Sequence, residues 1–157
     1  MKNKRLGFTL IELLVVVSII ALLSTAGLIA LRTAQRAGRD AKRISDMRSV
    51  QNALEIYFNR SGSYPQVFTW AELQAELALV GISSVPNDPI YTGSEASYLY
   101  APAPAVGGSA NNYVLRARLE LTDNRALLND ADGTLYGVDC GFPGAFPEDP
   151  PYYCVQL

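Results

Sequence analysis

One stretch of 24 residues near the N-terminus, from Phe8 to Leu31, contains a single ionisable side chain, that of Glu12. As an α-helix this stretch would be about 36 Å long, which is enough to cross a hydrocarbon layer of about 30 Å. A cleaved secretory signal has a shorter apolar region, of about 7 to 15 residues, followed by small residues at its cleavage site. The stretch therefore predicts a transmembrane helix that stays in the protein.

Charge is distributed unevenly around this helix. The cations Lys2, Lys4 and Arg5 precede it, which favours a cytoplasmic N-terminus and an external C-terminus. Five cations that follow it weaken this asymmetry, namely Arg32, Arg36, Arg39, Lys42 and Arg43. They could contact lipid head groups, DNA phosphates, another copy of the chain or solvent.

The two parts beyond the membrane have opposite net charge. Residues 32–60 carry seven Lys or Arg against three carboxylates, a net +4, whereas residues 61–157 carry three Arg against eleven carboxylates, a net −8. The acidic part disfavours binding to nucleic acid, and the opposite signs favour contacts between copies.

The sequence contains no histidine, and its two cysteines are Cys140 and Cys154. The missing histidine excludes zinc sites and His-based nucleophilic triads. An even pair of cysteines in an exported part favours a disulfide, which contributes about 3 kcal/mol for a loop of about 15 residues in the entropic model. Two free thiols are the alternative.

The first helix is expected to run from Phe8 to about residue 60, since no proline precedes Pro65 and a turn signal, SGSYP, starts at Ser61. Beyond the membrane its apolar residues recur every three or four positions and predict one buried face. They are Ile44, Met47, Val50, Leu54, Tyr57 and Phe58. Gly27 either weakens the helix locally or permits close helix packing in lipid.

The C-terminal part predicts a short helix and a small sheet. Thr69 and Glu72 have the spacing of a capping box before a helix from Trp70 to about Leu79, which Gly81 ends. Residues 97–101 and 112–121 are expected to pair as antiparallel strands, and Thr134 to Val138 is expected to form a third.

The N-terminus also carries a specific motif. A basic leader ends in Gly7 and is followed by FTLIELLVVV from Phe8. This order closely resembles the N-terminus of the type IV pilins and of the type II secretion pseudopilins. The resemblance implies that prepilin peptidase cuts after Gly7, that the new N-terminus at Phe8 is methylated, and that the N-terminal helices of many copies form the core of a filament.

The resemblance also gives Glu12 an expected partner, the α-amino group of Phe8 in a neighbouring subunit. An α-amine titrates near about 8 and is cationic at neutral pH, so the contact would offset the cost of burying the carboxylate. The alternative is a Glu12 side chain that extends to the membrane surface of a monomeric anchor.

Beyond residue 60 the resemblance points two ways. The segments NDP from Asn87, SYLY from Ser97 and NYVL from Asn112 are similar to major pseudopilins. The pair Cys140 and Cys154 instead resembles the C-terminal disulfide loop of type IV pilins, and we give it more weight. The loop between the cysteines is expected either to recognise a partner or to pack on the sheet.

Calcium is a further hypothesis. Asp130, Asp132 and Gly133 have part of the spacing of a calcium loop, although Leu128 stands at the first ligand position of an EF-hand. The resemblance to major pseudopilins implies calcium binding in this part of the chain. A site involving Asp123, Asp130 or Asp132 is therefore one expectation, and a solvated acidic turn is the other.

Together these features predict an α+β protein in which a long N-terminal helix packs on a small antiparallel sheet, the pilin fold that the resemblance implies. The expected segments are a cleaved leader (1–7), a transmembrane and assembly helix (8–31), its amphipathic continuation (32–60) and a globular part (61–157) with the disulfide loop 140–154.

The expected function is that of a structural, non-enzymatic subunit of a type IV pilin-like filament. Its expected partners are other copies, minor pilins, prepilin peptidase and an inner-membrane assembly platform. The chain would start in the inner membrane and end in an extracellular pilus. The alternatives are a major pseudopilin of a type II secretion system and a monomeric, membrane-anchored binding domain outside the cytoplasm.

Overall fold

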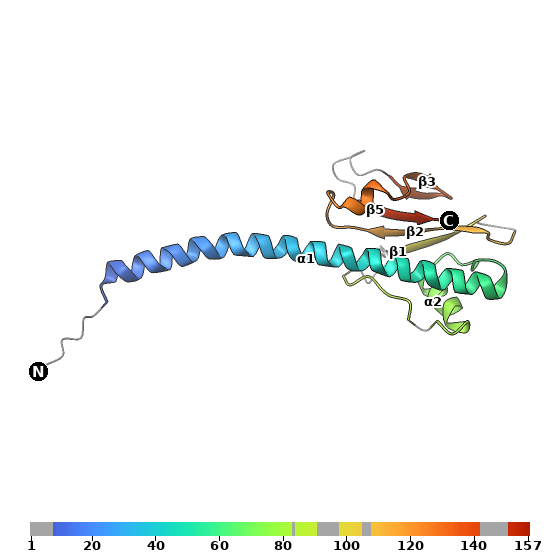
Figure 1. Ribbon diagram of the computed structural model, residues 1–157, viewed down its shortest axis with the longest axis horizontal. Coiled ribbons are helices and arrows are strands. Elements are labelled where there is room, and N and C mark those ends of the chain that lie inside the picture. Colours follow the sequence, from blue (N-terminus) through green and yellow to red (C-terminus); the bar gives the residue numbers. More distant parts are fainter. Residues whose placement is uncertain (1–7, 83, 91–97, 105–107, 142–150) are drawn as a thin grey trace, which may run out of the picture. The chain divides into compact units, whose positions relative to one another are not determined.

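The computed structural model describes residues 8–82, 84–90, 98–104, 108–141 and 151–157. In chain order the elements are α1 (Leu10–Ser61), α2 (Trp70–Leu79), β1 (Tyr98–Ala103), β2 (Asn112–Arg118), the 3-10 helix η1 (Arg125–Leu128), β3 (Gly133–Leu135), β4 (Val138–Cys140) and β5 (Tyr152–Gln156) (Figure 1). The chain divides into two compact units, Met1–Arg36 and Ala37–Leu157, and the division falls inside α1.

Helix α1 confirms the long helix that the sequence predicts. It is continuous through Gly27 and ends at Ser61. Gly62 follows with a φ of 75°, a left-handed conformation that glycine adopts without steric cost, and its N–H donates to the carbonyl of Phe58 at 2.8 Å. The glycine therefore ends the helix where the turn signal placed its end.

Helix α2 also forms as predicted. The hydroxyl of Thr69 accepts a hydrogen bond from the backbone N–H of Glu72, and the Glu72 carboxylate accepts one from the backbone N–H of Thr69. These two bonds satisfy backbone donors that the first turn of a helix leaves free. Leu73 and Leu77 are the buried residues of this helix.

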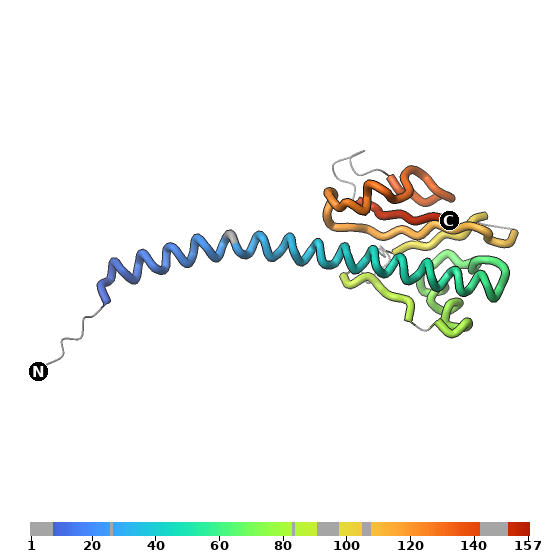
Figure 2. Tube along the Cα trace, viewed as in Figure 1, coloured from blue at the N-terminus to red at the C-terminus, as the bar shows by residue number. Residues whose placement is uncertain are grey.

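Three antiparallel strands form the main sheet in the order β1-β2-β5. Strands β1 and β2 are the pair that the sequence predicts, with Tyr100 opposite Leu115. Figure 2 shows that β5, in red near the C-terminus, lies beside β2 although far from it in sequence, with Cys154 opposite Arg116. Strand β5 is not predicted from the sequence, because the segment around Cys154 belongs to the expected disulfide loop 140–154.

The predicted strand from Thr134 to Val138 is wrong. The structure instead has a hairpin of two short strands, β3 and β4, with Tyr136 and Gly137 at the turn between them. Both turn residues have positive φ, 50° for Tyr136 and 83° for Gly137, as two-residue hairpin turns require. The chain therefore reverses in the middle of the segment that the sequence predicts as one extended strand.

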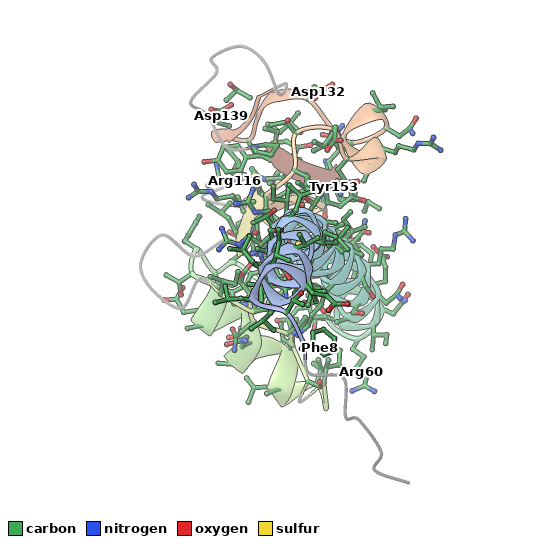
Figure 3. The ribbon with its side chains drawn as sticks, turned by 90° about the vertical axis from the view of Figure 1, so that its left-hand side faces the viewer. Phe8, Arg60, Arg116, Asp132, Asp139 and Tyr153 are labelled. Atoms are coloured by element: carbon green, nitrogen blue, oxygen red, sulfur yellow. A yellow bond between two sulfur atoms is a disulfide. The ribbon has the colours of Figure 1, made fainter. Side chains whose placement is uncertain are left out.

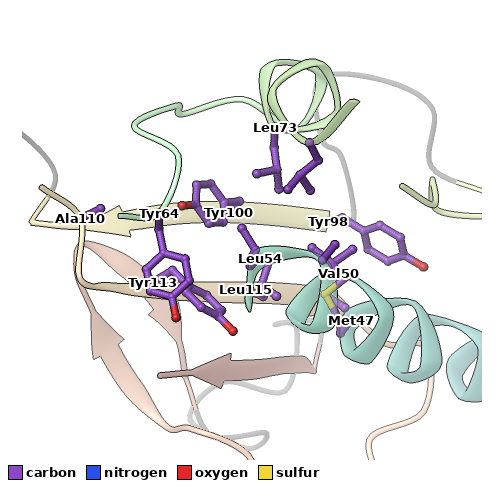
Figure 4. Packing of buried hydrophobic residues seen from close by; sticks show 13 residues of the cluster. Met47, Val50, Leu54, Tyr64, Leu73, Tyr98, Tyr100, Ala110, Tyr113 and Leu115 are labelled. Atoms are coloured by element: carbon purple, nitrogen blue, oxygen red, sulfur yellow. The ribbon is translucent and has the colours of Figure 1, made fainter. Parts of the chain in front are cut away.

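The core of the second unit lies between the sheet and the two helices. Figure 4 shows Met47, Val50 and Leu54 of α1 meeting side chains of α2, β1 and β2. Because successive strand residues point to opposite faces, Leu115 faces this core while Val114 belongs to a second cluster with Val138. The apolar face predicted for the second half of the helix is thus confirmed.

Candidate functional site

The first described residues set the start of α1. Thr9 precedes the helix, and its hydroxyl accepts a hydrogen bond from the backbone N–H of Glu12 at 3.3 Å. The same hydroxyl lies 3.5 Å from a carboxylate oxygen of Glu12. Thr9 and Glu12 therefore stand at the two positions of a capping box, a role that the sequence analysis does not consider for Glu12.

Glu12 is exposed, and no ion pair joins it to another residue within the described part of the chain. The side chains around it are apolar and exposed as well, with Leu10 at 81% and Ile11 at 72%. A carboxylate in such a surface needs a cationic partner or water once the surface is covered. Glu12 is thus an exposed carboxylate on an exposed, apolar face of the helix.

The apolar part of α1 is long enough to cross a membrane by length and composition. Its most apolar window of 18 residues has a mean hydropathy of 2.7, and none of that window is buried within the chain. An apolar surface of this size on a soluble protein would be an association site, and in a bilayer it would face lipid. The first unit therefore depends on lipid or on other protein copies to cover it.

The predicted disulfide is present. Cys140 of β4 and Cys154 of β5 are bonded, with an S–S distance of 2.01 Å and a Cα–Cα distance of 5.8 Å. Both cysteines are fully buried in the second cluster beside Val114 and Val138. The bond thus joins the β3–β4 hairpin to the main sheet, while most of the loop between the cysteines lies outside the described residues.

Arg116 adds a second link between the sheet and the hairpin. Its guanidinium lies 4.3 Å from the centroid of the Tyr152 ring, and its Nη1 donates to the carbonyl of Asp139 at 3.1 Å. Figure 3 shows Arg116 and Asp139 on the same side of the second unit. The hairpin is therefore held by a covalent bond, apolar contacts and one hydrogen-bonded cation.

The three aspartates of the calcium hypothesis do not come together. Among the described residues, which include Asp123, Asp130 and Asp132, no group of three acidic or cysteine side chains is arranged to hold a metal ion. One oxygen of Asp130 accepts from the backbone N–H of Cys154 at 3.0 Å, and burial, together with the nearby Asp132, raises the pKa of Asp130. Calcium binding stays a prediction, tested by thermal unfolding at millimolar calcium.

The structure also contains an ion cluster that the sequence analysis does not predict. Its members are Arg39, Asp40 and Arg43 of α1, Asp88, and Glu120. Arg43 and Asp40 are fully buried, and Asp88 is 6% exposed. From the sequence, Arg39 and Arg43 are expected to contact lipid head groups, DNA phosphates, another copy of the chain or solvent. For Arg43 all four expectations are wrong, because its side chain is buried and pairs with carboxylates of its own chain.

Arg43 is bonded to three carboxylates. Its Nε and Nη2 donate to the two oxygens of Asp88 at 2.6 and 3.2 Å, and its Nη1 donates to Asp40 at 2.8 Å and to Glu120 at 2.9 Å. This uses the planar fork of the guanidinium, which suits paired contacts with carboxylates. The cluster thus connects α1 to two segments that are distant in sequence.

Asp40 and Arg39 complete the cluster. The Asp40 carboxylate accepts the backbone N–H groups of Glu120 and Leu121 at 2.9 to 3.1 Å, and Arg39 donates to both oxygens of Glu120. The hydrogen bonds from Arg39 lower the pKa of Glu120 to about 2, with a further contribution from Arg43. Burial lowers the pKa of Arg43, but its three carboxylate partners raise it above the usual range. The cluster therefore holds two cations against three carboxylates.

A family comparison matches the N-terminus. Residues 2–28 match the prokaryotic N-terminal methylation motif. No curated protein and no solved structure matches the chain. The motif supports a precursor similar to the type IV pilins and pseudopilins, and the apolar helix and the α+β fold agree with it.

Proposed function

We propose that this chain is a structural subunit of a type IV pilin-like filament. It is made as a membrane-anchored precursor, cut after Gly7 by prepilin peptidase, and methylated at Phe8. The match of residues 2–28 to the methylation motif carries the proposal. The uncovered apolar surface of α1 supports it, because a filament core would cover that surface after the chain leaves the membrane.

Mass spectrometry of the protein extracted from membranes tests the processing step. We expect a chain that starts at Phe8, lacks the first seven residues and carries one added methyl group. An intact, unmodified chain from Met1 to Leu157 would contradict the proposal and favour a monomeric membrane-anchored binding domain. A chain cut but not methylated would retain the filament proposal and remove the methylation from it.

Glu12 has the assembly role in this proposal. Its exposed carboxylate accepts the cationic α-amino group of Phe8 from a neighbouring copy as the apolar helices come together. Burying the carboxylate among apolar side chains without that partner would be unfavourable, because an unpaired charge loses its water. A neighbouring copy in another alignment would leave the Glu12 carboxylate unpaired at the same cost. The ion pair therefore also favours one alignment of the two helices.

The variant Glu12→Ala tests this role. We expect normal insertion into the membrane and a loss of filament yield of at least about tenfold, measured in sheared surface fractions, because the unpaired terminus is a buried charge. Thr9→Ala is the matched control, since it removes the capping hydroxyl and keeps the carboxylate. Equal losses in both variants would mean that Glu12 acts by capping α1, and wild-type yield from Glu12→Ala would remove its assembly role.

The type of filament is the second part of the proposal. The disulfide between Cys140 and Cys154 favours a type IV pilus over a type II secretion pseudopilus, because the resemblance associates this loop with type IV pilins. We propose an N-terminus inside and a C-terminus outside the inner membrane, with minor pilins and the assembly platform as partners. Surface filaments labelled by an antibody to residues 37–157 would support this, and a filament confined to the periplasm would favour the pseudopilin.

A further inference from the structure

The apolar contact between α1 and the sheet does not by itself define one position of the helix. The buried residues Met47, Val50 and Leu54 follow one another at intervals of three and four positions. A shift of α1 by one turn, about 5.4 Å along its axis, would replace one apolar side chain by another over much of the contact. Because apolar burial has no directional preference, it separates such positions weakly.

The ion cluster has the directional preference that the apolar contact lacks. Arg43 lies one turn before Met47 on the same buried face, and it meets Asp88 and Glu120 through bonds of 2.6 to 3.2 Å. A one-turn shift would place Arg43 against apolar side chains or Met47 against the carboxylates. Either placement leaves buried charges without their partners, which is strongly unfavourable.

Asp40 adds an independent constraint on the same position. Its carboxylate accepts backbone N–H groups of Glu120 and Leu121, which belong to the segment that follows β2. These donors are fixed to the main chain and cannot follow a displaced helix by changing a side-chain rotamer. Asp40 therefore fixes the position of α1 along the sheet as a hydrogen-bond acceptor, and Arg43 fixes the same position as a donor.

The bond between α1 and strand β1 is less restrictive. The hydroxyl of Tyr98 donates to Asp46 at 2.8 Å, but the Asp46 side chain is half-buried and has access to water as an alternative partner. The groups of Asp40 and Arg43 lack that alternative because both residues are fully buried.

We propose that the cluster of Asp40, Arg43, Asp88 and Glu120 is a register lock, which fixes the axial position of α1 on the sheet of the second unit. Buried ion pairs often add little stability relative to apolar replacements, and setting a register is their best supported role. The consequence for assembly rests on the proposed function: copies joined through α1 present their globular parts in regular positions only if every copy has the same register.

Spin-label distance measurements on the purified full chain in detergent test the lock without requiring filaments. Labels are placed at Ser49→Cys on α1 and Asn112→Cys at the start of β2, both exposed and both outside the cluster. The native cysteines are bonded to each other and do not take up label. The otherwise unchanged protein is expected to show one narrow distance distribution.

The double variant Arg43→Met with Asp88→Asn removes one cation and one anion and preserves approximate volume. The amide oxygen that Asp88→Asn introduces can still accept the N–H of Ile90, as Asp88 does at 2.8 Å, and Asp40 and Glu120 keep their other donors. We expect a folded protein that keeps a population at the original distance, held by the bonds of Asp40 to the backbone N–H groups of Glu120 and Leu121, and gains a second one displaced by about 5 Å, which corresponds to one helical turn. Lys42→Met is the matched control, an exposed cation next to Arg43, and should keep one population.

A single population at the original distance in the folded double variant would remove Arg43 and Asp88 from the lock, and the same result after adding Asp40→Ala would overturn the proposal. Failure of the double variant and of Asp88→Asn alone to fold would also overturn it, because the cluster would then be needed for folding and not for the choice of register. Displaced populations combined with an unprocessed N-terminus would retain the lock and reject the filament function, so the two proposals fail separately.

Discussion

At the scale of single residues, Glu120 shows how a charge takes its properties from its neighbours. In the sequence it is an isolated acid shortly after β2, and no local pattern connects it to Arg39 or Arg43. The fold brings both cations to its carboxylate, with Arg39 at 2.6 Å. The contact with Arg39 joins residues separated by 81 positions, so sequence periodicity cannot reveal it.

The lowered pKa of Glu120 predicts a specific loss of stability in acid. The usual pKa of the group is 4.5, and in the folded chain it is about 2. A depressed pKa means that the ionised group stabilises the fold above about pH 4.5 and that this contribution is lost as the pH falls toward 2. It amounts to roughly 2 kcal/mol once the partial exposure of the side chain to solvent is taken into account.

Thermal unfolding followed by circular dichroism between pH 7 and pH 2 measures this contribution. The wild-type melting temperature should fall more steeply below pH 4.5 than that of Glu120→Gln, which has no charge to lose. Asp123→Asn, a change at an exposed acid, is the control and should follow the wild-type curve. Parallel curves for the wild type and Glu120→Gln would contradict the assignment.

At the scale of elements, local sequence signals predicted the two helices but did not predict the hairpin of β3 and β4. The capping box at Thr69 and the glycine after Ser61 act through neighbouring residues, so the sequence alone placed α2 and the end of α1. Strands β3 and β4 have three residues each, and their turn contains Tyr136 at positive φ, which is uncommon for a non-glycine residue. The hairpin is instead held by contacts with the sheet and by the disulfide.

Removing the disulfide should therefore destabilise the second unit. The double variant Cys140→Ser with Cys154→Ser is expected to lose about 3 kcal/mol of unfolding free energy, because it opens a loop with a sequence separation of 14. Denaturant unfolding of the detergent-solubilised chain measures the loss. Reduction of the unmodified protein should reproduce it, and a stability unchanged by both treatments would show that the hairpin does not depend on the bond.

At the scale of the whole molecule, the division at Arg36 predicts which part of the chain folds without lipid. The second unit starts at Ala37, and its core takes Met47, Val50 and Leu54 from α1. We expect a fragment of residues 37–157 to be soluble and to unfold cooperatively. A fragment of residues 62–157 lacks those side chains and should lack a cooperative transition, since its sheet would expose its apolar face.

Circular dichroism and size-exclusion chromatography of the two fragments test this expectation. Equal stability of both fragments would mean that α1 is dispensable for the core. Aggregation of the longer fragment alone would mean that residues before Ala37 contribute to folding, against the division of the chain into two units.

The sequence by itself determined the features that depend on neighbouring residues. The apolar run fixes a membrane-length helix, residues 2–28 carry the N-terminal methylation motif, and the caps and glycines set the limits of the helices. Each of these features depends on side chains within a few positions of one another, so the spacing of residues along the sequence is enough to predict it.

The tertiary structure decided which distant residues meet. It placed β5 beside β2, reversed the chain at Tyr136, and buried Arg43 among three carboxylates instead of leaving it in a basic, exposed face. These outcomes depend on the packing of segments separated by tens of residues, because a charge is stable in the interior only where the fold supplies its partners. A local pattern contains no information about those partners.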